Sequence, residues 1–115
     1  MWFRGIDMEL ENREEGKYKV LIVNEKVDLY NLSEFKKALL PLAEENSHVA
    51  VELKENRYDL CSSVIGALIS GKKRVPDGGS FVLINSSETV SALLTMSGLG
   101  RFFTTVEDIS DLPRN

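Results

Sequence analysis

Three short apolar runs, separated by segments with helical spacing, constrain the fold of this chain more than any other feature. The runs are Tyr18–Val23, Val49–Leu53 and Phe81–Ile84. Each is apolar along most of its length, which is typical of a strand covered on both faces. Parallel sheets cover their strands in this way, because the crossover helices between successive strands pack on the sheet. We therefore predict an α/β domain with a largely parallel sheet.

The segments between these runs have the spacing of amphipathic helices. Apolar residues recur every three or four positions from Leu32 to Leu42, which predicts a helix over 32–45. Asn31-Leu-Ser-Glu34 resembles a capping box at its start. Pro41 lacks a backbone donor and is expected to bend or shorten the last turns.

Two further helices are expected. One begins at Ser62-Ser63, buries an apolar stripe from Val64 to Ile69, and ends near Val75 because Pro76-Asp-Gly-Gly79 is a strong turn signal. The other has cap candidates at 85–87, with Gly98 closing its end.

The remaining strands are expected near the two ends of the chain. Ile6, Met8 and Leu10 alternate with acidic residues, as in an exposed strand, and a turn over 13–17 would join it to Tyr18 as a hairpin. A last strand is expected over 102–106, and 54–57 reads as polar loop. The predicted fold is a mixed, mostly parallel sheet of about five strands, packed by three to four helices in one layer or two.

Length and composition indicate one domain. A chain of 115 residues, 43% of them hydrophobic, can bury a core without metal or disulfide support. We expect a single domain over 1–115, with its core at about 18–106. Residues 1–17 would form an edge strand and turn, and 107–115 a tail or short helix.

Charge and cysteine content exclude several classes of protein. The net charge of −4 argues against a nucleic-acid-binding protein, because Lys72-Lys73-Arg74 is the only dense basic cluster and no aromatic residues interrupt it. The longest apolar runs are too short to insert into a bilayer. With one cysteine, Cys61, and no secretion signal, the chain is expected to be cytoplasmic.

The segment Tyr58–Ile69 points most directly to a function. It places the adjacent hydroxyls of Ser62 and Ser63 at the start of an apolar helix that follows a buried strand. A helix start carries unpaired N–H groups and partial positive charge, so it favours a phosphate or a partner's carboxylate. Serine is also a common helix cap, whatever the function, and a capping role is compatible with modification.

This segment, followed by Gly66-Ala-Leu-Ile69, Gly78–Asn85, Leu94–Leu99 and Phe103, resembles the STAS domain family over about residues 18–106. The Val27-Asp28 step before the first helix also fits the family. The resemblance is strongest to the small bacterial anti-sigma factor antagonists.

The resemblance implies a non-enzymatic regulator of transcription that works by partner switching. Such a protein binds an anti-sigma factor that is also a serine kinase of the GHKL type. Phosphorylation by that kinase breaks the complex, and a PP2C-type phosphatase restores it. The serine that is modified in the family corresponds to Ser62. A phosphate adds charge and bulk to a surface that otherwise packs against the partner.

Two positions depart from the family motif: Cys61 replaces an aspartate and Val64 replaces a glycine. Asp59 is the nearest carboxylate before Ser62. Two alternatives therefore stay open. Either Ser62 is a phosphorylation site, or the chain binds constitutively, as a stressosome-like scaffold or the cytoplasmic subunit of an ABC lipid transporter does. The residues expected to contact a partner are Asp28, Asp59, Cys61, Ser62, Ser63, Val64 and Ile65, and Met96 and Leu99 extend this surface if they are exposed.

Signals for an enzyme are weak. Gly66 to Lys73 nearly matches a phosphate-binding P-loop, but Lys73 replaces the hydroxyl that would hold Mg²⁺, and the segment has a helical pattern. His48 and Cys61 lack a third residue that would orient a catalytic pair. They are also too few for a zinc site, so no cofactor or metal is expected.

Overall fold

The computed structural model describes residues 8–56, 60–84 and 88–113. Along the chain the elements are β1 (Leu10–Glu15), β2 (Tyr18–Val23), α1 (Leu32–Glu45), β3 (His48–Leu53), the 3₁₀ helix η1 (Lys54–Asn56), α2 (Ser62–Arg74), β4 (Ser80–Ile84), α3 (Glu88–Met96), β5 (Thr104–Val106) and the 3₁₀ helix η2 (Ile109–Asp111). The predicted order of strands and helices is confirmed.

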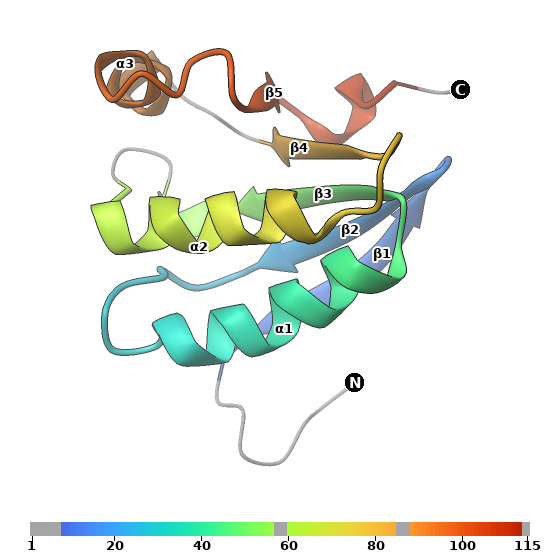
Figure 1. Ribbon diagram of the computed structural model, residues 1–115. Helices are drawn as coiled ribbons and strands as arrows, with labels where there is room; N and C mark the ends of the chain where they lie inside the picture. Colours follow the sequence, from blue (N-terminus) through green and yellow to red (C-terminus); the bar gives the residue numbers. More distant parts are fainter. Residues whose placement is uncertain (1–7, 57–59, 85–87, 114–115) are drawn as a thin grey trace.

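The strands form one mixed sheet in the order β1-β2-β3-β4-β5 (Figure 1). β1 is antiparallel to β2, whereas β2, β3, β4 and β5 run parallel to their neighbours. The parallel strands therefore all end at the same edge of the sheet, and the loops that follow them gather there. This edge is the left side of Figure 1, where α2 begins.

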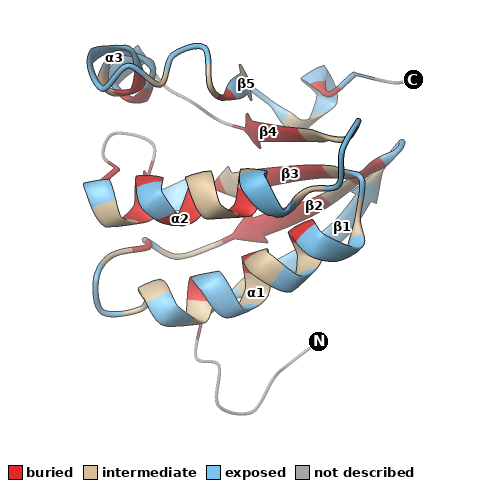
Figure 2. Cartoon of the chain, in the orientation of Figure 1, coloured by how far each residue is buried: buried red, intermediate tan, exposed pale blue. Residues whose placement is uncertain are grey.

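The helices bury their apolar sides against one face of the sheet. Phe35 and Leu39 of α1, Val64 and Leu68 of α2, and Leu94 of α3 join one core cluster. The facing strand residues in that cluster include Leu21, Val49 and Leu83. Of the one or two helical layers expected, the described chain forms one. Figure 2 shows the buried residues along β2, β3 and β4, beneath the helices.

The opposite face of the sheet is covered by the end of the chain. Val20, Ile22, Ala50 and Val82 form a second apolar cluster, against which Leu112 is buried. Asp108 caps η2 by accepting a hydrogen bond from the backbone N–H of Ser110. The expected tail or short helix over 107–115 thus contains a short helix that packs on the sheet.

The hairpin at the start differs from the expected one. β1 spans Leu10–Glu15, whereas the alternation of residues predicted a strand over 6–11 and a turn over 13–17. The pairing runs from Leu10 opposite Val23 to Glu15 opposite Tyr18, so β1 extends along the full length of β2. Gly16, with a φ of 58°, supplies the left-handed residue that a tight turn requires. Residues 6 and 7 lie outside the described residues.

Two smaller expectations were wrong. Asn31 precedes α1, but among the described residues its side chain makes no capping hydrogen bond. Pro41 was expected to bend or shorten the last turns of α1; the helix continues to Glu45, as predicted, and a bend at Pro41 stays a prediction. The last strand is limited to Thr104–Val106, because Phe103 is buried in the core instead. Phe102 packs edge-to-face on Phe103, with ring centroids 5.0 Å apart. The cap candidates at 85–87 lie outside the described residues.

Candidate partner-binding site at the start of helix α2

Ser62 is the first residue of α2 and is exposed to solvent. The residue in the N-cap position is Cys61, whose extended backbone (φ −76°, ψ 160°) ends the loop. Its carbonyl oxygen accepts hydrogen bonds from the N–H groups of Val64 and Ile65, both at 3.1 Å. The Ser62 hydroxyl thus lies one residue inside the helix, in the first turn, where the partial positive charge of the helix is strongest.

The neighbours of Ser62 divide between the surface and the core. Cys61 is exposed and Ser63 is partly exposed, whereas Val64 and Ile65 have only 0% and 7% of their surface in contact with solvent. Val64 packs with Leu68 in the helix-side core. The valine that replaces the family's glycine is therefore buried inside the domain and adds no exposed side chain next to Ser62.

The substitution at Cys61 does alter the exposed surface. The first turn of α2, whose residues are all described, contains no carboxylate. Where the family motif has an aspartate directly before the serine, this chain has a thiol, which lowers the negative charge beside Ser62. Asp59, the nearest preceding carboxylate, lies outside the described residues.

Asp28 lies in the loop between β2 and α1, at the same edge of the sheet (Figure 1). Its carboxylate Oδ1 accepts hydrogen bonds from the N–H groups of Tyr30 (2.9 Å) and Asn31 (3.3 Å). The amide side chain of Asn31 accepts from the Asp28 N–H and donates to the Lys26 carbonyl. Asp28 is thus a turn residue, and its contact with a partner remains a prediction.

The buried side chain of Asn56 connects η1, which follows β3, to the β2–α1 loop. It comes from η1, directly after β3, and only 3% of its surface is exposed. Its Nδ2 donates to the carbonyl of Val27, and its Oδ1 accepts from the Val27 N–H. The sequence predicted only a polar loop over 54–57. The sequence signal that could have indicated the role of Asn56 was the position of an asparagine shortly after a buried strand.

Two large apolar side chains on the β2–α1 loop were also missed. Leu29 is 70% exposed and Tyr30 is 96% exposed. Both residues fall between the polar residues Asp28 and Asn31, and neither fits the helical spacing of α1. This position could have indicated that their side chains are exposed. Met96, at the end of α3, is 85% exposed, whereas Leu99 is half-buried against the core.

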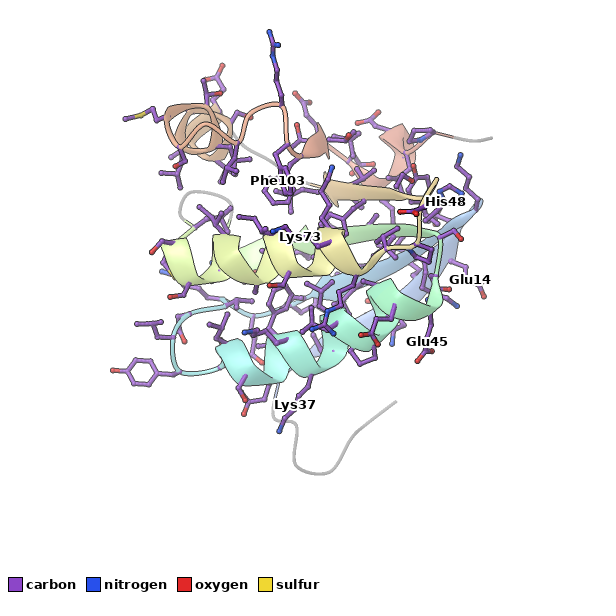
Figure 3. All side chains as sticks on the ribbon, viewed as in Figure 1. Glu14, Lys37, Glu45, His48, Lys73 and Phe103 are labelled. Atoms are coloured by element: carbon purple, nitrogen blue, oxygen red, sulfur yellow. The ribbon has the colours of Figure 1, made fainter. Side chains whose placement is uncertain are left out.

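The structure separates the residues of the weaker enzymatic signals. His48 begins β3, whereas Cys61 lies beyond the other end of that strand, and Figure 3 shows His48 on the side of the domain away from the start of α2. Its Nδ1 is 2.8 Å from the Ser80 hydroxyl. The segment resembling a P-loop lies inside α2, and the ammonium of Lys72 donates to the Phe102 carbonyl. Within residues 8–56, 60–84 and 88–113, no cluster of three acidic, histidine or cysteine residues is arranged to hold a metal.

Comparison with known families identifies the fold. A family model described as the STAS domain matches residues 9–112. The chain belongs to the STAS domain family. No match was found among curated protein sequences. In the described part of this STAS domain, no helix is long and apolar enough to cross a membrane.

Solved structures of anti-sigma factor antagonists share the fold. One from Mycobacterium paratuberculosis is 12% identical, with a TM-score of 0.78 over 94% of this chain and 92% of its own. One from Planctomyces limnophilus is 15% identical, with a TM-score of 0.76 over 89% and 92%. SpoIIAA in its unphosphorylated form is 17% identical, with a TM-score of 0.61 over 85% and 86%. At these identities the similarity concerns the fold.

Proposed function

We propose that this STAS domain is a cytoplasmic anti-sigma factor antagonist, a non-enzymatic protein that binds an anti-sigma factor with GHKL-type serine kinase activity. The observation that carries the proposal is the position of Ser62, exposed in the first turn of α2 at the edge where the parallel strands end. Phosphorylation of Ser62 would end binding, and a PP2C-type phosphatase would restore it. Release of the sigma factor by the bound kinase would then control transcription.

The surroundings of Ser62 are suited to such a switch. The first turn of a helix favours a phosphate, so the modified state would not destabilise the fold. The same phosphate carries about −1.5 to −2 charges at neutral pH and would disrupt a surface that packs closely on a partner. One structural neighbour, the anti-sigma factor antagonist SpoIIAA, was solved in its unphosphorylated form, and this supports the proposal of a phosphorylation switch.

The partner surface that we propose consists of exposed or partly exposed residues: Asp28, Cys61, Ser62 and Ser63. Asp59 stays in the proposal on sequence grounds alone. Val64 and Ile65 support this surface from the core, since their side chains are buried.

Phosphate transfer can be measured directly. The protein is incubated with ATP and the GHKL-type kinase encoded in the same genome, and its intact mass is recorded for the wild type, Ser62→Ala and Ser63→Ala. We expect one added phosphate on the wild type and Ser63→Ala, and none on Ser62→Ala. Ser63→Ala is the matched control, because it removes the adjacent hydroxyl of the same helix turn.

Two other results would change the assignment. Tight binding of the kinase without phosphate transfer would indicate a protein that binds constitutively. The replacement of the family's aspartate by Cys61 would then contribute to the loss of phosphorylation. Failure to bind any such kinase, together with co-purification with an ABC transporter, would favour a subunit of that assembly.

A further inference from the structure

The β2–α1 loop presents Leu29 and Tyr30 to solvent side by side in sequence, with 70% and 96% of their surfaces exposed. Single exposed apolar residues are common on proteins. Two large apolar side chains exposed next to each other on one loop call for an explanation, because neither packs in the core. Both lie at the edge of the sheet where α2 begins (Figure 1).

The backbone that carries this pair is held in place by side-chain hydrogen bonds. Asp28 accepts from the N–H groups of Tyr30 and Asn31. Asn31 in turn accepts from the Asp28 N–H at 2.8 Å and donates to the Lys26 carbonyl at 2.8 Å. These bonds close the loop on itself around Leu29 and Tyr30.

The loop is also fixed to the body of the domain. Val27 is 1% exposed and belongs to the helix-side core. Its N–H and carbonyl both bond to the buried amide of Asn56, at 2.9 and 3.0 Å. A loop ordered before binding loses little conformational entropy when a partner packs on it, so exposed apolar groups on such a loop make efficient anchors.

We propose that Leu29 and Tyr30 are apolar anchors that insert into an apolar pocket of the protein partner, beside the surface around Ser62. The proposal rests on the proposed function, since the partner is the GHKL-type kinase. Tyrosine is enriched among the residues that dominate binding energy, because its ring buries a large area while its hydroxyl remains hydrated.

The charges around the loop favour a protein pocket over a lipid surface. Among the described residues, the charged groups that flank the loop are Lys26 and Lys54, with the carboxylates of Glu25, Asp28 and Glu55. An anionic membrane attracts loops with an excess of basic residues. Here the acidic groups outnumber the basic ones, so an uncharged pocket is the better match.

A second copy of this chain is the less favoured partner, and one cavity of the described surface illustrates the reason. A stable interface buries roughly 800 Å² on each partner, more than two side chains supply, unless they enter a pocket. A surface cavity of about 470 Å³ between α3 and β5 is lined by Glu88, Ser91, Thr105, Val106 and Glu107. Two carboxylates make that cavity unsuitable for a leucine and a phenol ring.

The test measures the dissociation constant of the kinase complex by calorimetry for the wild type, Leu29→Ser, Tyr30→Ser and the double variant. Tyr30→Phe keeps the ring. Glu45→Ala is the surface control, because Glu45 is exposed at the far end of α1 (Figure 3). Thermal unfolding checks that each variant is folded. We expect all of them to fold, because the substituted positions are exposed.

We expect Tyr30→Ser to raise the dissociation constant at least about 10-fold and the double variant about 100-fold. Tyr30→Phe and Glu45→Ala should stay within about 2-fold of the wild type. The loss should be similar at about 50 and 500 mM salt, because apolar burial is not screened.

Four outcomes would overturn the proposal. Unchanged binding by the double variant would reject the anchors while leaving the proposed function intact. Failure of the wild type to bind the kinase would reject the proposed function and the anchors with it. A wild-type dimer that the double variant abolishes would assign the pair to self-association. Binding of the wild type, but not the double variant, to phosphatidylglycerol-containing vesicles would assign it to a lipid surface.

Discussion

Asn56 and Val27 are joined by two hydrogen bonds between one side chain and one backbone unit. The Asn56 Nδ2 donates to the Val27 carbonyl at 3.0 Å, and its Oδ1 accepts from the Val27 N–H at 2.9 Å. Both residues are buried, and they belong to loops that follow neighbouring parallel strands. The pair holds together the two loops that flank the proposed partner surface.

Replacing Asn56 by alanine should destabilise the domain and loosen the β2–α1 loop. The substitution leaves the buried N–H and carbonyl of Val27 without partners, which lowers the free energy of unfolding by about 1–3 kcal/mol. Urea denaturation measures this loss, and hydrogen exchange should show faster exchange at the Val27 amide. Lys54→Ala, an exposed position in the same 3₁₀ helix, is the control. Unaltered exchange at Val27 would contradict the role of Asn56.

The two glycines of α2 should respond oppositely to alanine. A Cβ at Gly66 would meet no atom within 4 Å, so Gly66→Ala should raise the free energy of unfolding by about 0.5–1 kcal/mol through helix propensity. A Cβ at Gly71 would lie 2.8 Å from Cδ2 of Leu39 and 3.2 Å from Cε2 of Phe81. Gly71→Ala should therefore lower the free energy of unfolding, by about 1–3 kcal/mol, as overpacking does. Equal effects in urea denaturation would show that α1 does not pack closely at Gly71.

The carboxylate of Asp108, which caps the start of η2 near the C-terminus, should stabilise the domain in a pH-dependent way. The hydroxyl and backbone N–H of Ser110 donate to the Asp108 carboxylate and hold its pKa below the ordinary value of 3.8. A lowered pKa in the folded state means that the stabilisation is fully present above pH 3.8. It is lost as the pH falls through the folded-state pKa.

NMR titration of the Asp108 carboxyl carbon checks this linkage. In Ser110→Ala the pKa of Asp108 should rise towards 3.8, because the largest cause of the shift is the Ser110 hydroxyl. Ser97→Ala, at another exposed serine, should leave it unchanged. The same pKa in wild type and Ser110→Ala would refute the hydroxyl's contribution.

The sequence predicted the order of elements and most of their bounds because apolar periodicity is a local property. The helix predicted over 32–45 agrees with α1, and the buried runs agree with β2, β3 and β4. The predictions failed where two signals competed. Phe102 and Phe103 suit either the start of the last strand or packing against the helix-side core. In the structure they pack against this core, and β5 begins only at Thr104.

The candidate site was predicted in part. The sequence placed Ser62 at the start of a helix and grouped Asp28 with it among the residues expected to contact a partner. It did not show that Val64 and Ile65 point inward, that Asp28 is engaged in a turn, or that Leu29 and Tyr30 are exposed. Each of these depends on which face of a loop or first helical turn meets the core.

The adjacent serines, the apolar strands and the family motifs of this STAS domain are determined by residues close together in the chain. Whether each side chain is buried, paired or free for a partner was decided only by the tertiary structure. The physical reason is that these states depend on contacts between distant residues, as between Asn56 and Val27, which are 29 positions apart. Local spacing encodes a helix or strand, whereas burial and hydrogen bonding are set when the strands align and their loops meet.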